Sequence, residues 1–476
     1  MRRLLAGVSL ASLLSVAPGA SASAETLRQA LIATYQTNPR LDAERARLRA
    51  TDESVPQAKA GYRPSATANA DTGYQRIETK PSLSGDGSGQ TWGYSITVEQ
   101  SVFRGFRTVN GVREAEAGVR AGRETLRNVE QQVLLEAVTA YADVLRDQAL
   151  VRLREGSVAV LSKDLQAAET RRAVREVTRT DVAQAQARRA KAVSALDLAR
   201  SNLKTSRAVY ERVVGRPATQ LSDPSPPVKL LPQSIDDAIK VGEKEHPNVT
   251  SALQREKAAR HSVDKIWGEL LPEVRLEASY GQRFDPSKSI QEQDSASVTG
   301  RVRMPLYEGG ETQSRVRAAK HTHVSRLQEI EQARSETQAA VITAWSRLSA
   351  TRAQLQSDRV QVESARIALE GVREEERVGQ RTLLDVLNAE QELLDAEVQQ
   401  VVTRRELVVA TYTMLASVGR LNPAELKLTD AVYDAEAHYN EVERKWWGVS
   451  ITHANGRTEV IERLDDWGAE DRYHEK

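Results

Sequence analysis

The chain has 476 residues, of which 28% are charged and only 4% aromatic, and its formal net charge is +1. This near-neutral charge excludes bulk electrostatic attraction to nucleic acid, so we expect no nucleic-acid partner. Because cysteine is absent, the chain cannot form disulfides, use a thiolate, bind metal through cysteine or carry a lipid on an N-terminal cysteine.

Residues 1–24 have the features of a secretory signal peptide. Arg2 and Arg3 give a basic start, Leu4 to Val16 form an apolar stretch, and Ala22-Ser23-Ala24 fits an A-x-A cleavage site. The apolar stretch is too short to span a bilayer, and no later stretch approaches the roughly 20 apolar residues that a spanning helix needs. We therefore expect an exported chain without a helical anchor.

The rest of the chain reads as two copies of one unit, in which Asn38-Pro39 returns as His246-Pro247 and Asp181-Val182 as Asp385-Val386. Each copy predicts short helices, a hairpin of two strands and a pair of very long helices. The copies span 25–220 (hairpin 64–104, long helices 107–215) and 234–421 (hairpin 272–307, long helices 310–419), separated by a proline-rich connector at 221–233 and followed by an equatorial segment and charged tail at 422–476.

Capping signals predict the starts of the short helices. Thr26-Leu27-Arg28-Gln29 fits a capping box, and Ser234 with Asp237 is a looser relative of it. Asn38-Pro39 and His246-Pro247 each place proline at a first helical position, where no amide hydrogen is needed.

The long helices are predicted where proline is absent, between residues 81 and 217 and between 305 and 423. A helix from about Thr108 to Arg172 would be on the order of 100 Å long at 1.5 Å per residue. Its partner from about Thr180 to Val214, and the one from Thr382 to Ser417, are shorter. These are coiled-coil dimensions, longer than an ordinary domain uses.

Alternating side chains predict four strands, in residues 65–74, 92–102, 274–284 and 296–306. Each run is close to the 9–11 residues with which a tilted strand crosses a bilayer, apolar outward and polar inward. A half-buried hairpin in a soluble sandwich is the alternative. The signal peptide and aromatic residues near strand ends favour the membrane; those aromatics are Tyr74, Trp92, Phe103, Tyr280 and Tyr307.

The alternation also assigns side chains to the two faces of the strands. The charged residues expected to line a pore are Arg275, Arg301 and Arg303, partly offset by Glu99 and Glu277, although simple wetting of the wall would also explain them. The residues expected to face lipid are Trp92, Tyr94, Ile96, Val98, Val274, Leu276, Tyr280, Val298, Val302 and Leu306.

Glycine-, serine- and aspartate-rich loops, Lys80 to Gln90 and Asp285 to Ser295, are expected to join the strands on the side away from the helices. Four strands cannot close a barrel, and an open edge in lipid leaves unpaired backbone groups that cost several kcal/mol each. We therefore expect an obligate oligomer.

Four stretches resemble the TolC family of trimeric outer-membrane exit ducts: Asn38 to Leu41, Ala60 to Pro64, Pro305 to Gly310 and, most specifically, Val378 to Glu390. The resemblance implies a mainly α fold with a membrane β part: a long coiled-coil helical barrel plus four strands per chain of a twelve-stranded β-barrel shared by a homotrimer. It implies the outer membrane of a Gram-negative bacterium, with the helical part in the periplasm. The implied partners are a periplasmic adaptor (a membrane fusion protein), an inner-membrane ABC or proton-driven transporter, and outer-membrane lipid.

The resemblance further implies a gate near the two helix-to-helix turns. Thr180 and Asp181 would face Arg381 in an arginine–carboxylate clamp, although Asp181 would also be stabilised as an ordinary residue near a helix N-terminus. Asp385 and Asn388 open a polar stripe that continues through Glu392, Asp395 and Gln399. Family members commonly have aspartate at both of the first two positions, so we expect one ring of three Asp385 side chains and a weaker cation preference.

Two positions depart from the family pattern. Glu376 stands where some members have a gating tyrosine. The first turn, Val174 to Val177, lacks the glycine of its counterpart, so we expect an adaptor to dock at the second tip, formed by Val378, Gly379 and Gln380.

No motif for catalysis, a cofactor or a metal is visible, so we expect no enzyme: His321 and His323, for example, are two apart and would not share a helix face. The leading hypothesis is a passive conduit for type I protein secretion or multidrug efflux, opened when the coiled coils untwist on meeting the adaptor and the transporter. The sequence of residues 384–391 is most similar to that of family members that serve type I protein secretion, and this resemblance favours secretion. The alternative is a periplasmic adaptor or a structural coiled-coil protein.

Overall fold

The computed structural model describes residues 24–78, 80–81, 86–225, 227–287, 289–429, 432–452 and 458–459. The predicted signal peptide, apart from Ala24, and the predicted charged tail from residue 460 onward lie outside these residues.

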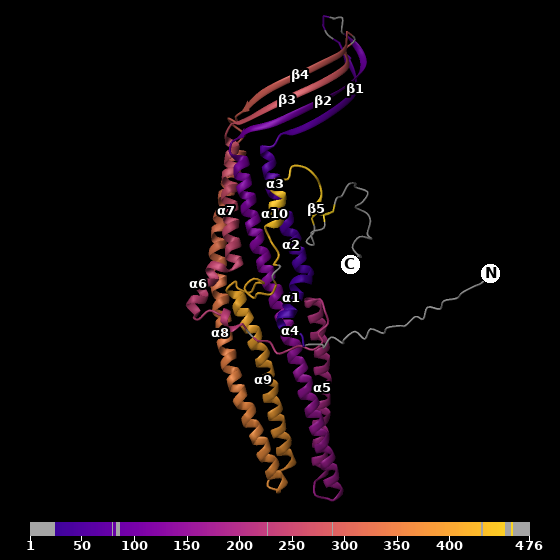
Figure 1. Cartoon of the computed structure of the whole chain (residues 1–476), viewed down its shortest axis with the longest axis vertical. Helices are drawn as coiled ribbons and strands as arrows, with labels where there is room; N and C mark the ends of the chain where they lie inside the picture. Colours follow the sequence, from indigo (N-terminus) through magenta and orange to yellow (C-terminus); the bar gives the residue numbers. More distant parts are fainter. Residues whose placement is uncertain are drawn as a thin grey trace, which may run out of the picture.

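The molecule is elongated, with a β-sheet at one end and two pairs of long helices that run from it to the opposite end (Figure 1). The shorter helices lie beside the upper half of the long ones. The first copy consists of α1 (Leu27–Thr37), α2 (Pro39–Asp52), α3 (Ser54–Lys59), η1 (Ala60–Tyr62), β1 (Ser65–Ile77), β2 (Gly87–Arg104), α4 (Arg107–Ala173) and α5 (Arg179–Val214). The second consists of α6 (Ile235–Glu245), α7 (Pro247–Trp267), η3 (Gly268–Leu270), β3 (Glu273–Ser287), β4 (Ile290–Arg303), α8 (Glu311–Arg377) and α9 (Leu383–Ser417). The remaining elements are η2 (Val228–Leu230), α10 (Ala437–Val442), β5 (Ile451–Thr452) and β6 (Thr458–Glu459).

The short helices begin where their capping signals lie. Thr26 and Gln29 form the complete capping box of α1, and proline is the first residue of both α2 and α7. Helix α2 stops at Asp52 because Pro56, four residues on, has no amide hydrogen for the Asp52 carbonyl and its ring clashes with that carbonyl. No proline follows in α7, which therefore runs unbroken to Trp267.

The long helices end within a residue or two of their expected limits. Helices α4 and α8 have 67 residues each, roughly 100 Å at 1.5 Å per residue, and pack along α5 and α9 as two helical hairpins. Among the helices that the structure describes, none contains an apolar stretch of membrane-spanning length.

The main core is a belt halfway along the molecule, where α1, α4, α5 and α9 meet the chain that follows α9. Tyr141, Tyr210, Leu415 and Leu421 are completely buried there. The Tyr141 hydroxyl lies 2.6 Å from the carbonyl oxygen of Ser222, so the connector between the copies is fastened to this belt. Below the belt α4 buries few side chains, mainly Leu161 and Ala168.

The sheet is antiparallel, in the order β1-β2-β3-β4. Its register places like residues side by side on each face. Ala68, Ile96, Tyr280 and Ala296 form one cross-strand row, and the adjacent row on the opposite face is Thr67, Thr97, Ser279 and Ser297. The sheet therefore has one apolar and one polar face, as the alternation predicted.

Two details of the strand prediction were wrong. The strands have 13, 18, 15 and 14 residues, because the polar hairpin ends still pair through their backbones. Pairs such as Gln75 with Gly89 and Phe284 with Glu292 extend the ladder into both expected loops. Tyr280 lies in the middle of β3, paired with Ile96 and Ala296, and not near a strand end.

The sheet has two free edges, since β1 pairs only with β2 and β4 only with β3. Every residue of β4 is exposed. The long helices also expose large apolar side chains, including Leu198, Val360 and Ile367. Free sheet edges and exposed large apolar side chains are both typical of surfaces that a binding partner or a membrane covers.

Candidate functional site

The two helix-to-helix turns form the tips of the helical hairpins, at the end of the molecule farthest from the sheet (Figure 1). Each tip starts its second helix with a complete capping box. The Asp181 carboxylate accepts a hydrogen bond from the Thr178 amide at 2.8 Å, and that of Asp385 accepts one from the Thr382 amide at 3.0 Å. Hydrogen bonds from this amide and from the Thr382 hydroxyl lower the pKa of Asp385, so its charge persists into acid.

The clamp expected between Thr180, Asp181 and Arg381 is not formed within one chain. Arg381 donates through Nε to Glu375 of its own tip at 2.8 Å, while Asp181 is engaged by Thr178. Thr180 is exposed. Within one chain Asp181 therefore acts as an ordinary helix-capping residue. A clamp between Asp181 and Arg381 would require a second chain.

Two other contacts join the hairpins near their tips. The Arg171 guanidinium on α4 donates to the Glu376 carboxylate on α8 at 2.5 Å, so Glu376 forms an ion pair between the two helical hairpins. Arg188 on α5 donates to the Asn388 side-chain oxygen on α9 at 2.8 Å. Asn388 thus links the two hairpins through its amide oxygen instead of adding a second carboxylate.

Above these contacts, two carboxyl groups meet between the hairpins: Asp164 on α4 and Glu390 on α9. Burial raises the pKa of Asp164 to about 6, and the charge of Glu390 and a hydrogen bond with it act in the same direction. Arg373 lies 2.5 Å from the other oxygen of Glu390 and partly offsets the effect. Among the described residues, Asp164 Oδ2 and Glu390 Oε2 are buried acceptors without a donor. When Asp164 is protonated, its carboxyl group can donate to Glu390 Oε2, which satisfies both atoms.

The sequence analysis missed this pair, although a signal was present. Asp164 lies between Leu161 and Ala168, and Glu390 between Leu387 and Leu394, all four of which are buried. These spacings put each acid on an apolar helix stripe. An acidic residue on such a stripe indicates a partner across the interface.

Both tips have one residue in a left-handed backbone conformation, but the residue is glycine in one tip and arginine in the other. This difference predicts a stabilising substitution. Gly379 has φ +79 and its counterpart Arg175 has φ 64, a left-handed conformation that costs a non-glycine residue roughly 1–2 kcal/mol. We expect Arg175→Gly to raise the free energy of unfolding by about 1 kcal/mol per chain, measured as a higher urea midpoint of the assembled protein. Glu176→Gly, one residue on, is the matched control and should lower it; equal shifts for both variants would contradict the explanation.

On the polar face of the sheet, like charges stand directly opposite and unlike charges are diagonal. Glu99 pairs in register with Glu277, and Arg275 with Arg301. Arg275 instead reaches the Glu99 carboxylate at 2.7 Å, and Arg301 reaches Glu277 at 3.4 Å. The expected basic set is therefore largely neutralised, with Arg303 at the end of β4.

The apolar face carries the residues expected to contact lipid. Trp92 stacks on Phe284 with ring centroids 4.0 Å apart, which places a pair of aromatic rings toward the outer end of the apolar rows. Val274 is half-buried, and the other nine are exposed: Trp92, Tyr94, Ile96, Val98, Leu276, Tyr280, Val298, Val302 and Leu306.

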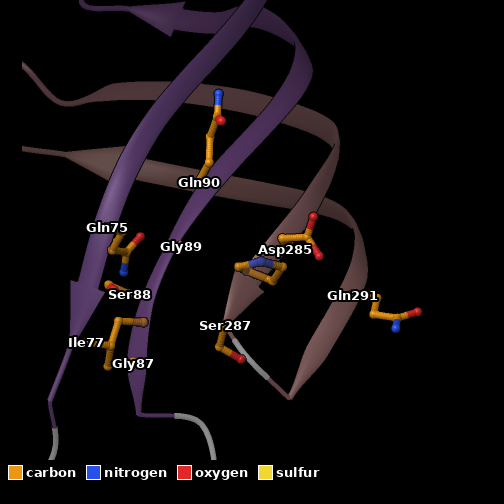
Figure 2. A pocket seen from close by; sticks show the side chains of 10 residues that line it. Gln75, Ile77, Gly87, Ser88, Gly89, Gln90, Asp285, Ser287 and Gln291 are labelled. Atoms are coloured by element: carbon orange, nitrogen blue, oxygen red, sulfur yellow. The ribbon is translucent and has the colours of Figure 1, made fainter.

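At the ends of the two β-hairpins farthest from the helices lies a polar hollow of about 370 Å³ (Figure 2). Gln75 and Gln90 come from the first hairpin, and Asp285 and Ser287 from the second. The amide, carboxyl and hydroxyl groups of these side chains can all form hydrogen bonds with water, which suits a water-filled mouth. Within the described parts of the chain, no three His, Cys, Asp or Glu residues are grouped to hold a metal ion.

A family model described as outer membrane efflux protein matches residues 29–216 and 239–420. The outer membrane efflux protein BepC of Brucella suis biovar 1 (strain 1330) is 38% identical over 445 residues, which cover 93% of this chain and 96% of that protein. The alkaline protease secretion protein AprF of Pseudomonas aeruginosa is 25% identical over 345 residues, 71% of each chain.

The solved structure of the outer membrane protein VceC from Vibrio cholerae has the same fold. It matches with a TM-score of 0.72 and 18% identity, over 83% of this chain and 96% of that one.

Proposed function

Because the chain belongs to the outer membrane efflux protein family, and lies in the outer membrane with its helical part in the periplasm, we propose that it is the passive, trimeric exit duct of a tripartite export system. The observation that carries this proposal is the four-stranded sheet with one apolar face, one polar face and two free edges. Pairing β1 of one chain with β4 of the next in three copies closes a twelve-stranded barrel. No backbone edge is then left in lipid.

In this proposal the polar face of the sheet lines the pore, with Arg275, Glu277, Arg301, Arg303 and Glu99 on the wall. Their diagonal ion pairs leave little net charge, which suits a conduit for varied cargo.

The gate of the duct would be the lower ends of the hairpins, which untwist when an adaptor and an inner-membrane transporter engage them. Thr180 and Asp181 would meet Arg381 of a neighbouring subunit, and three Asp385 side chains would form one acidic ring. The cation preference would be weak, since Asn388 is neutral and already bound by Arg188. The exposed tip of Val378, Gly379 and Gln380 would receive the adaptor.

Native mass spectrometry of the purified protein in detergent tests the assembly. We expect three times the mass of one mature chain and, in planar bilayers, ion conductance. A monomer that stays soluble without detergent would contradict the proposal, and a trimer that does not conduct would favour a structural coiled-coil protein or an adaptor.

The cargo is proposed to be either a protein or a small molecule: the name of AprF states protease secretion for that relative, and the name of BepC states efflux without naming what is exported. Deleting the gene separates the two. Loss of a protein from the culture medium supports secretion, and increased sensitivity to toxic compounds supports efflux.

A further inference from the structure

Two adjacent tryptophans are exposed in the segment that follows α10. Trp446 is 68% exposed and Trp447 is 93% exposed. Val449 and Ile451, just beyond them, are also exposed. A cluster of large apolar side chains in water is costly, so this patch calls for a partner.

The segment is fastened to the chain just before β1. The Lys59 ammonium lies 2.6 Å from the Glu443 carboxylate, and Arg63 donates to the Lys445 carbonyl at 2.9 Å. The Arg63 guanidinium also lies over the Trp446 ring, 4.6 Å from its centroid. The Trp446 ring is thus held in its exposed position by a cation–π contact, and Trp447 follows it directly in the chain.

This contact lies at the level where the apolar face of the sheet begins. Arg63 precedes the first residue of β1, Ser65, by two positions, and the first apolar pair, Ala66 with Val98, follows at once. Gln100 is on the same face of β2 as Val98, and its side chain donates to the Tyr62 carbonyl at 3.1 Å. The tryptophans therefore adjoin the lower border of the lipid-facing surface.

We propose that Trp446 and Trp447 insert into the periplasmic leaflet of the outer membrane, at the boundary between phospholipid headgroups and acyl chains. The indole ring prefers this boundary because it is apolar with one polar N–H. Arg444, which is exposed and lies two residues before the rings, adds a cation that suits anionic headgroups. The pair supplies part of the lower aromatic girdle, opposite the stacked Trp92 and Phe284 at the outer side.

The absence of native cysteine permits a direct test. A nitroxide label on Val449→Cys, beside the intact tryptophans, is followed by electron paramagnetic resonance in the trimer, reconstituted into phosphatidylethanolamine–phosphatidylglycerol vesicles. Collisions with oxygen report lipid, and collisions with a water-soluble nickel chelate report solvent. We expect an oxygen-to-nickel ratio several-fold above that of a label on Val174→Cys at the hairpin tip.

Two readings overturn the proposal. High accessibility to nickel, as at the tip, means that the segment lies in water, and low accessibility to both reagents means that a neighbouring subunit covers it. A second variant carries Trp446→Gln and Trp447→Gln in the same labelled chain. Its oxygen-to-nickel ratio should fall to the value of the label at the hairpin tip, while the trimer persists. An unchanged ratio in that variant would show that the tryptophans do not insert.

Discussion

The substitution Asp164→Asn is expected to keep the two helical hairpins of each chain paired at every pH between about 5 and 8. In the unaltered chain the pairing should weaken as pH rises through about 6. The amide of Asp164→Asn has the shape of the protonated carboxyl group. It can donate to the buried oxygen of Glu390 without titrating, so the shared hydrogen bond becomes permanent.

The sign of the pH effect follows from the direction of the pKa shift. Burial, together with the neighbouring Glu390, raises the pKa of Asp164 from 3.8 to about 6, so between these values the arrangement with the two carboxyl groups in contact keeps the proton and the separated one loses it. As pH rises through 6 the proton is lost, and two adjacent carboxylates repel. The neighbouring charges on α8 do not reverse this, since Arg373 lowers the pKa of Asp164 but Glu376 raises it. The ratio of paired to separated hairpins should therefore fall by at most about tenfold between pH 5 and pH 8, with most of the fall complete by pH 7.

Single-channel conductance in planar bilayers, recorded from pH 5 to pH 8, measures the effect. The unaltered trimer should spend more time in conducting states as pH rises, and Asp164→Asn should stay low throughout. Asp197→Asn removes an exposed carboxylate from α5 and should follow the unaltered trimer. If Asp164→Asn followed it too, the carboxyl pair would have no part in holding the hairpins.

The helices and the two faces of the sheet were predictable because each depends on local pattern. Proline-free stretches, the Thr26–Gln29 capping box and period-two alternation of side chains constrain the backbone before any tertiary contact forms. The prediction of where the strands end was wrong at the polar ends of the β-hairpins, because it too relied on local pattern alone. A residue such as Gly89 has little strand preference of its own and joins the ladder only because its partner, Gln75, is already in register.

The contacts between the hairpins could not be derived in this way. Arg171 with Glu376 and Asp164 with Glu390 join helices of different copies, and each copy alone leaves them as ordinary surface charges or oddities on an apolar stripe. The place of Trp446 depends likewise on Arg63, far away in the sequence. Such pairs are set by how two long elements lie against each other, which short-range periodicity does not encode.

A lysine in place of Ile96 is expected to prevent assembly of the trimer. Ile96 stands between Ala68 and Tyr280 on the apolar face and is 48% exposed. A lysine facing lipid near the middle of a bilayer costs about 2–4 kcal/mol, and three subunits incur this cost together. Because a domain's whole stability is about 5–15 kcal/mol, little folded trimer should remain.

Thr97→Lys is the matched control, since residues 96 and 97 are neighbours in one strand and point to opposite faces. Thr97 lies in the polar row with Thr67 and Ser279, where a lysine would remain in water. The amount of heat-modifiable trimer in outer-membrane fractions should therefore fall at least tenfold for Ile96→Lys and stay near normal for Thr97→Lys. If Thr97→Lys abolished the trimer and Ile96→Lys did not, lipid would lie on the polar side of the sheet. That result would remove the basis for a water-filled duct. Three such sheets can enclose water only if their charged face turns inward.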